Sequence, residues 1–245
     1  MTYDLTELQT SAAALGITLS EAQLAQFLTY YKMLIAWNEK MNLTAVTDFQ
    51  EVLEKHFLDS LSLIHAVDLH AAAEKKPLRL IDVGTGAGFP GIPLKIAFPQ
   101  LSVVLLDSLN KRIRFLHAVT EELGLTNITA IHGRSEELAR SKEYRESFDL
   151  CVSRAVANLS TLSEYCLPFV RVGGLFLSYK GSEVDEEAET AEHAIHLLGG
   201  SIREIKRFSL PNTTYGRSLV VIQKKKNTPG KYPRKAGTPS REPLQ

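Results

Sequence analysis

The chain has 245 residues, of which 44% are hydrophobic and 23% charged, an ordinary balance for a globular protein with a sizeable core. Its two cysteines, Cys151 and Cys166, lack the spacing of zinc ligands, which argues against a disulfide scaffold or a metal site and favours a reducing, cytoplasmic location. No apolar run approaches the roughly 20 residues of a membrane span, and the first residues lack the features of a signal peptide. We therefore expect a cytoplasmic protein without a metal and without membrane contact.

The formal net charge is zero, but the charges are unevenly distributed. Residues 203–245 hold 11 basic and 2 acidic side chains, whereas residues 1–202 hold 17 basic and 26 acidic ones. A basic segment on an acidic body indicates a polyanionic partner that is reached through one end of the chain. From charge alone, a tail that only improves solubility is an equal alternative.

Residues 1–75 have the periodicity of helices and predict a small N-terminal helical cap. Ser20 and Gln23 have the spacing of a capping box, the arrangement that begins a helix. Apolar residues follow at intervals of three and four, which gives this helix one apolar face: Leu24, Phe27, Leu28, Tyr31, Leu34 and Ile35. A second periodic segment runs over residues 49–65 and has His56 on its apolar face.

Residues 76–224 have the alternating pattern of an α/β domain. Apolar runs at 78–83, 102–107, 128–132, 148–153 and 175–179 predict strands, and helical patterns such as 109–123 and 159–170 lie between them. This alternation predicts a parallel sheet covered on both faces. The runs at 202–208 and 218–223 are joined by a polar loop without a helix, which predicts an antiparallel hairpin at the edge of a seven-stranded sheet. Residues 225–245 are rich in Lys, Pro and Gly and predict an extended basic tail.

A glycine-rich loop, D-V-G-T-G-A-G-F-P at residues 82–90, follows the first predicted strand. Glycines let the backbone turn sharply and approach a ligand closely, with helix N–H groups pointing at it. Asp107 ends the second strand, where a carboxylate can accept hydrogen bonds from ribose hydroxyls. The G-x-G-x-x-G pattern of nicotinamide-binding folds fails when it is counted from Gly84, because Phe89 is the sixth residue. Counted from Gly86 it is complete, but it then contains Pro90.

With an acidic residue two positions before its first glycine, the loop resembles the S-adenosylmethionine loop of Rossmann-like (class I) methyltransferases, whose sheet also ends in an antiparallel hairpin. The segment after the third strand places Glu136 where that fold contacts adenine. Glu136 is alternatively a residue that stabilises a helix start. The loop after the fourth strand, residues 153–158, has no D-P-P-Y, N-P-P-Y, Pro-Cys or Thr-Cys motif for amine or pyrimidine methylation. The absence of these motifs favours a target atom that needs no general base. Guanine N7 is such an atom because it already carries a lone pair, so positioning and charge placement could supply most of the catalysis.

Motifs along nearly the whole chain together resemble one family, the bacterial 16S rRNA guanine-N7 methyltransferases, also called glucose-inhibited division protein B. They are W-N-E-K-M-N-L-T at 37–44, H-F-L-D-S at 56–60, the loop at 82–90, D-S at 107–108, S-R-A at 153–155 and K-Y-P-R with G-T-P at 231–239. The resemblance implies S-adenosylmethionine as the cofactor and 16S rRNA or the small ribosomal subunit as the partner. It implies cofactor contacts at Gly84, Phe89, Ser135, Glu136 and Arg154, with Asp107 as the ribose partner. The family often has alanine at the position of Ser135, which fits a backbone contact.

No catalytic base can be assigned, and the candidates for positioning the substrate are Arg154 and His56. Arg154 follows a strand at the edge where α/β sheets bind ligands, which favours a functional role, whereas His56 has a core position as its alternative. Several other residues stay open between a structural and a functional role: Asn42, Thr44, Asp59, Ser60 and Lys180. The lysines and arginine at 224–226 and 231–235 are expected to neutralise rRNA phosphates, with Tyr232 stacking on a base.

Two other classes of function compete with the methyltransferase. A nicotinamide-dependent oxidoreductase requires the G-x-G-x-x-G register and a catalytic Tyr-x-x-x-Lys or His/Arg set, and neither is visible. A non-catalytic RNA-binding factor that kept the fold predicts a degraded cofactor loop. Asp82, Gly84, Gly86 and Asp107 are all in place, however, which favours the enzyme.

Overall fold

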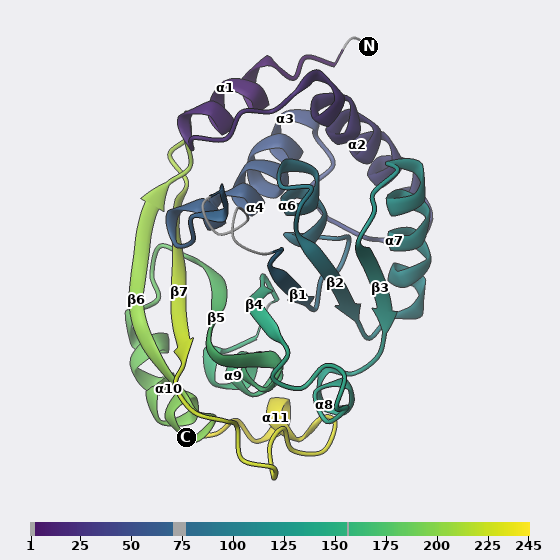
Figure 1. Ribbon diagram of the computed structural model, residues 1–245. Coiled ribbons are helices and arrows are strands. Elements are labelled where there is room, and N and C mark those ends of the chain that lie inside the picture. The colour runs from purple at the N-terminus through teal and green to yellow at the C-terminus, as the bar shows by residue number, and fades with distance from the viewer. Residues whose placement is uncertain (1–2, 71–76, 156) are drawn as a thin grey trace.

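A seven-stranded sheet forms the centre of the computed structural model, which describes residues 3–70, 77–155 and 157–245 (Figure 1). The strand order is β3-β2-β1-β4-β5-β7-β6. Strands β1 to β5 pair in parallel, and β7 is antiparallel to both β5 and β6, so the predicted edge hairpin is confirmed. The strands are β1 (Arg79–Val83), β2 (Ser102–Asp107), β3 (Ile128–His132), β4 (Phe148–Ser153), β5 (Val170–Gly181), β6 (Gly200–Ser209) and β7 (Gly216–Lys224).

The sheet separates two apolar cores because successive strand residues point to opposite faces. Leu80 of β1 packs into the core shared with α2 (Glu21–Met41), α6 (Gly91–Ala97) and α7 (Asn110–Glu122). Its neighbour Ile81 packs into the other core, with α9 (Leu159–Cys166) and α10 (Asp185–Leu197). The short helix α8 (Ser135–Leu138) follows β3, and a 3₁₀ turn, η3 (Leu167–Phe169), follows α9. The first strand, β1, lies in the middle of the sheet. The order of strands runs outward from β1 to β3 on one side and continues with β4 on the other, and such sheets bind ligands at this switch point.

The N-terminal helices cover one end of the sheet and share its core. The Ser20 hydroxyl accepts a hydrogen bond from the backbone N–H of Gln23, and the side-chain oxygen of Gln23 accepts one from the backbone N–H of Ser20. The predicted capping box therefore begins α2. The Tyr30 hydroxyl, fully buried, donates to the Ala87 carbonyl at 2.5 Å and thereby ties α2 to the glycine-rich loop. The other cap elements are α1 (Thr6–Ala14), α3 (Phe49–Val52), the π-helical η1 (Leu53–Leu58), α4 (Asp59–Leu61) and η2 (Ser62–His65).

The C-terminal segment differs from the extended, solvated tail that its composition predicts. After β7 the chain folds back past α9 and α8 and forms a short helix, α11 (Thr238–Arg241) (Figure 1). Tyr232 is only 6% exposed and packs in the core, so the expectation that it stacks on a base is wrong. Lys224 is fully buried; its ammonium donates to the Leu167 carbonyl at 2.6 Å and lies 3.2 Å from a Glu146 carboxylate oxygen. It is therefore unavailable to RNA phosphates.

The reason for this difference is that the partners of the tail lie far away in the sequence. Arg145 donates hydrogen bonds to the carbonyls of Thr228 and Tyr232 at 2.7 and 3.0 Å, across more than eighty residues. Glu146, beside it, accepts a hydrogen bond from the Thr228 amide at 2.6 Å. Local composition carries no trace of such contacts, whereas Lys225, Lys226, Lys231 and Lys235 do remain exposed.

Replacing Lys224 with alanine should lower the free energy of unfolding by about 2–4 kcal/mol, because Glu146 and the Leu167 carbonyl would lose a buried partner. Lys226→Ala removes the same charge two residues away from an exposed side chain and should change stability by less than about 0.5 kcal/mol. Urea denaturation of both variants measures the difference. Two equally small effects would contradict a packed tail.

Candidate active site

The carboxyl ends of β1 to β4 meet at a pocket of about 610 Å³, within the usual range for small-molecule sites. The structure brings all the residues expected to contact the cofactor, and both positioning candidates, to this one cavity: Gly84, Phe89, Asp107, Ser135, Glu136, Arg154 and His56. Thr44 also lines it. Val156, in the loop after β4, lies outside the described residues.

The glycine-rich loop needs its glycines because its backbone is left-handed. Gly84, Gly86 and Gly88 have φ angles of +72°, +63° and +102°, which disfavour residues with a side chain. A Cβ on Gly88 would lie 2.5 Å from the Ile92 side chain and 2.7 Å from the Tyr30 hydroxyl, so this glycine also allows the cap to approach closely. The first N–H group of α6 does not point at the pocket as expected, because Gly91 donates it to Asp82 at 2.8 Å.

Asp82 lies beneath the loop and is fully buried. Its Oδ2 accepts hydrogen bonds from the Thr85 hydroxyl at 2.6 Å and from the Gly91 amide, which closes the loop over the end of β1. Its Oδ1 has no hydrogen-bond partner among the described residues. Burial raises the pKa of Asp82 from its ordinary 3.8 to about 7, against the opposing effect of these hydrogen bonds.

Asp107 presents its carboxylate at the end of β2 and is held there by three donors. It accepts from the amides of Gly86 and Leu109, both at 2.9 Å, and from the Arg112 guanidinium at 3.1 Å. The same Arg112 nitrogen also lies 3.5 Å from Oδ1, so both carboxylate oxygens are held by donors at the pocket wall. Arg112 also lines the pocket, and sequence reasoning missed it because an arginine on a helix after a strand has no distinguishing pattern.

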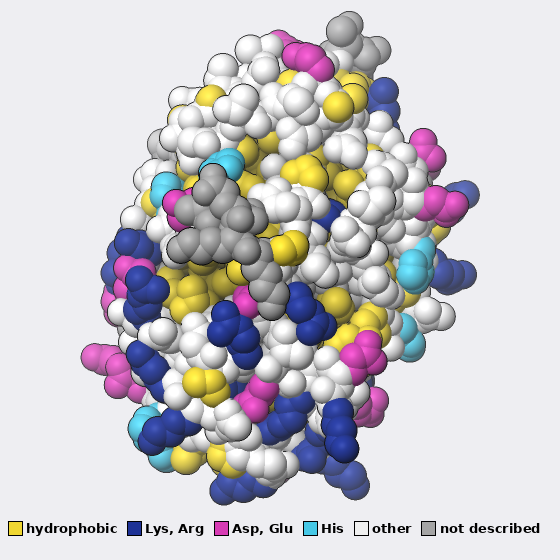
Figure 2. All heavy atoms as spheres, viewed as in Figure 1, with side chains coloured by type: hydrophobic (Ala, Val, Ile, Leu, Met, Phe, Trp, Pro, Cys, Tyr) yellow, Lys and Arg dark blue, Asp and Glu magenta, His cyan; other side chains and the backbone are white. Residues whose placement is uncertain are grey.

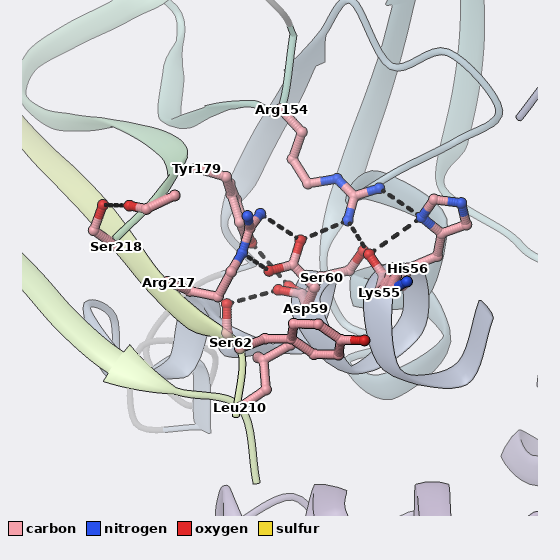
Figure 3. A network of polar contacts seen from close by, with 12 residues as sticks. Lys55, His56, Asp59, Ser60, Ser62, Arg154, Tyr179, Leu210, Arg217 and Ser218 are labelled. Atoms are coloured by element: carbon pink, nitrogen blue, oxygen red, sulfur yellow. Dashed lines mark hydrogen bonds and ion pairs between the residues drawn. The ribbon is translucent and has the colours of Figure 1, made fainter. Parts of the chain in front are cut away.

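Arg154 is fixed in the pocket wall by a buried carboxylate (Figure 3). Asp59, only 2% exposed, accepts from Arg154 at 2.7 Å and from both Nε and Nη2 of Arg217, at 2.7 and 3.0 Å. Arg154 also donates to the Lys55 carbonyl at 3.1 Å. One carboxylate thus faces two guanidinium groups, which leaves a net positive charge beside the pocket. Arg217, on β7, was not among the sequence candidates, and Asp59 is the anchor of the group.

His56 stacks on Phe89, with 4.5 Å between ring centres, and its Nε2 lies 2.8 Å from the Thr44 hydroxyl. Burial, and then the positive charge of Arg154, lower the pKa of His56 to about 4, so the imidazole is neutral at pH 7. The guanidinium of Arg154 lies 5.2 Å from the Phe89 ring centre. The pocket wall here is an aromatic pair with a cation beside it.

The remaining open residues are mostly structural. Asn42 ends α2 in a left-handed conformation, and the Ser60 hydroxyl donates to the His56 carbonyl. Lys180 donates to the Ala157 carbonyl at 3.0 Å and to Glu187 at 2.7 Å, outside the main pocket. Glu136 is 3% exposed, and its Oε1 accepts from the Gly237 amide at 2.8 Å, a contact that sequence reasoning did not foresee.

Over 3–70, 77–155 and 157–245, no three His, Cys, Asp or Glu side chains are grouped as ligands of a metal ion. Within the same ranges, none of the helices has both the length and the apolar character needed to cross a membrane.

The strand order with its antiparallel seventh strand, the glycine loop after β1 and the acid that ends β2 together define a Rossmann-like methyltransferase. Comparison with protein families places the chain more narrowly: it belongs to the GidB family, rRNA small subunit methyltransferase G, whose model matches residues 23–215. The resemblance stated from the sequence is thereby confirmed.

Relatives from several bacteria match over nearly their whole length. The ribosomal RNA small subunit methyltransferase G of Lachnoclostridium phytofermentans is 54% identical over 94% of this chain and 93% of its own. The protein of the same name from Alkaliphilus metalliredigens is 52% identical over 94% and 95%. Among solved structures, M. jannaschii TYW2 in complex with AdoMet is similar at a TM-score of 0.49 and 12% identity, over 64% of this chain and 74% of that one.

The cofactor of this family is S-adenosylmethionine, and the residues present fit it. The pocket has room for a ligand of this size, since sites for small molecules span about 300–1,000 Å³. The left-handed glycines allow the loop to approach it without side chains. Asp107 lines the pocket at the end of β2, where a carboxylate can accept a hydrogen bond from a ribose hydroxyl.

The stability of the ligand-free protein should depend on pH through Asp82. A carboxyl whose pKa is raised in the folded state stabilises the fold fully below about pH 4 and loses this contribution as the pH rises through about 7. Urea unfolding of wild type and Asp82→Asn between pH 4.5 and 7.5 should therefore show wild type losing stability relative to the variant. His56, with its lowered pKa, acts in the opposite direction but is present in both proteins and cancels. A difference that does not change with pH would contradict a raised pKa for Asp82.

Proposed function

We propose that this protein transfers the methyl group of S-adenosylmethionine to N7 of a guanine in the 16S rRNA of the small ribosomal subunit, in the cytoplasm. The observation that carries the proposal is that the residues expected around the methyl donor line one pocket, in a chain of this family. The curated relatives are named for the methylation of small subunit ribosomal RNA. Neither the oxidoreductase nor the non-catalytic factor finds support in these comparisons.

We assign the cofactor contacts to Gly84, Phe89, Asp107, Ser135, Glu136 and Arg154 along the edge of the sheet. The order β4-β1-β2-β3 places the loop of Gly84 between Arg154 on one side and Asp107 and then Glu136 on the other. In this assignment the methionine part binds at β1, the ribose at Asp107 and the adenine near Glu136. The reacting end of the cofactor then lies toward Arg154, Phe89 and His56.

When it is bound, the cofactor supplies an electrophilic methyl group on a sulfonium. Guanine N7 already carries a lone pair, so the residues at the β4 end need to hold the base in line and need not remove a proton. A neutral His56 stacked on Phe89, with the guanidinium of Arg154 beside them, offers planar groups on which a nucleobase can stack. Asp59 keeps Arg154 in place, and Arg217 adds a second positive charge that favours a polyanion.

We propose three parts for the chain: the helical cap at 1–75, the cofactor-binding domain at 76–224 and the C-terminal segment at 225–245. The first boundary lies outside the described residues. Figure 2 shows Lys and Arg side chains gathered over the lower half of this face, where Figure 1 places α8, α9 and the C-terminal segment. This distribution supports an approach of the RNA from that end of the molecule.

Gly84→Val and Gly86→Val should abolish binding of S-adenosylmethionine, because a β-branched residue is strained at a positive φ and its side chain would enter the pocket. Asp107→Ala should weaken binding by about 1–3 kcal/mol. Gly124→Val is a matched control, since Gly124 has a φ of +61° and does not line the pocket. Calorimetric titration measures the affinities. Unchanged affinity in all three pocket variants would contradict the cofactor assignment.

Methylation of N7 can be tested with small subunits from cells that lack the gene. Incubation with purified protein and S-adenosylmethionine labelled in its methyl group should label the 16S rRNA, and borohydride and aniline treatment should cleave the RNA at one guanine. Subunits from wild-type cells, already methylated, should take up little label. Label recovered in a different methylated nucleoside would contradict the N7 assignment. Cofactor binding without transfer to any subunit would instead indicate the non-catalytic alternative.

A further inference from the structure

The C-terminal segment contacts the cofactor pocket indirectly, through a residue of the pocket wall. The amide of Gly237 donates to Glu136 Oε1 at 2.8 Å, and Glu136 is a buried residue of the pocket wall on α8. No residue of the described part of the segment lines the pocket itself. The contact therefore acts on the orientation of the Glu136 carboxylate, since a hydrogen bond to one oxygen fixes the plane of the group.

The same segment also holds α9, which forms the neighbouring part of the wall through Leu162 and Tyr165. Glu164 of α9 is only 1% exposed, and its two oxygens are occupied by Arg234. The Arg234 backbone amide donates to Oε1 at 2.6 Å, and its guanidinium donates to Oε2 from Nη2 at 2.7 Å and to both oxygens from Nε at 3.0 Å. This is a geometry in which arginine binds a carboxylate strongly and in one orientation.

A further contact with α9 lies at Pro239, later in the segment. The Thr161 hydroxyl of α9, buried, donates to the Pro239 carbonyl at 3.0 Å. Residues 234–239 thus bond to α9 at both ends and to α8 in the middle. Residues 234–239 therefore link α8 and α9, two short helices that carry pocket residues.

We infer that residues 234–239 are a buttress of the cofactor site, with Arg234 as a positioning residue that keeps Glu136 and α9 in place for the nucleoside part of S-adenosylmethionine. The inference rests on the cofactor assignment of the proposed function. It gives the basic segment a role different from neutralising RNA phosphates, because the charge of Arg234 is already matched by Glu164.

Variants of two adjacent residues distinguish a role in positioning the cofactor site from a role in attracting RNA. Arg234 is paired with Glu164, whereas Lys235 is exposed. Arg234→Met and Lys235→Met each remove one positive charge from adjacent positions, and Arg234→Lys keeps the charge but loses the planar fork. A role in positioning predicts that only the Arg234 variants affect the cofactor. A role in long-range attraction of RNA predicts equal effects of both methionine variants on RNA affinity.

The experiment is calorimetric titration of the four proteins with S-adenosylmethionine and with adenosine, combined with steady-state kinetics and filter binding of 16S rRNA over a salt series. Arg234→Met should raise the Kd for S-adenosylmethionine and for adenosine about tenfold. It should raise the KM for S-adenosylmethionine by a similar factor and leave kcat and RNA affinity within about twofold. Arg234→Lys should recover part of the loss, and Lys235→Met should leave both Kd values within about twofold.

A folded Arg234→Met protein that binds S-adenosylmethionine as wild type does would overturn the buttress. So would a loss of S-adenosylmethionine affinity without a loss of adenosine affinity, because the affected part would then not be the nucleoside end. Should Arg234→Met fail to fold, as judged by circular dichroism, Arg234→Lys decides: an affinity equal to that of wild type overturns the inference. Wild-type protein that does not bind S-adenosylmethionine contradicts the proposed function and the buttress together, whereas unaffected variants contradict the buttress alone.

Discussion

The carboxylate of Asp59 joins three segments of the chain that meet beside the pocket. It comes from the helical cap, and it binds Arg154 from the loop after β4 and Arg217 from β7. These residues lie 95 and 158 positions away in the sequence. A buried ionised group is tolerated only when its partners satisfy it, so the cap, the central strands and the edge hairpin must be in register for Asp59 to be stable at all. The position of Arg154, and with it the wall of the pocket beside β4, follows from that requirement.

A second buried carboxylate, Asp82, has the corresponding task at the glycine-rich loop. Asp82 closes the glycine loop through Thr85 and Gly91, and Asp107 accepts the Gly86 amide from the next strand. Because the loop is bonded to carboxylates on two neighbouring strands, its left-handed glycines are held in one conformation before a ligand arrives. Such preorganisation reduces the entropy that binding must overcome. The cap contributes from the other side, through the Tyr30 hydroxyl on the Ala87 carbonyl.

The sequence predicts what depends on neighbouring residues and fails where distant ones decide. The five parallel strands and the edge hairpin are visible as apolar runs, and Gly84 and Asp107 are recognisable from their place after such runs. The burial of Lys224 is not predictable, because its partners Leu167 and Glu146 come from another part of the fold. The same holds for Arg217, whose only distinguishing feature is that β7 brings it to Asp59.

The position of β7 has a consequence for how the protein is made. Although β7 is the last strand in the sequence, it lies between β5 and β6 and bonds to both. Chains emerge from the ribosome N-terminus first and begin to fold as they do so. While residues 216–224 are still inside the exit tunnel, β5 has an open edge, β6 has no neighbour in the sheet, and Asp59 lacks Arg217. The pairing of β5 and β6 with β7, and of Asp59 with Arg217, therefore waits until β7 has emerged. A nascent chain cut short before β7 would expose the open edge of β5 and an unpaired β6 to aggregation and proteolysis.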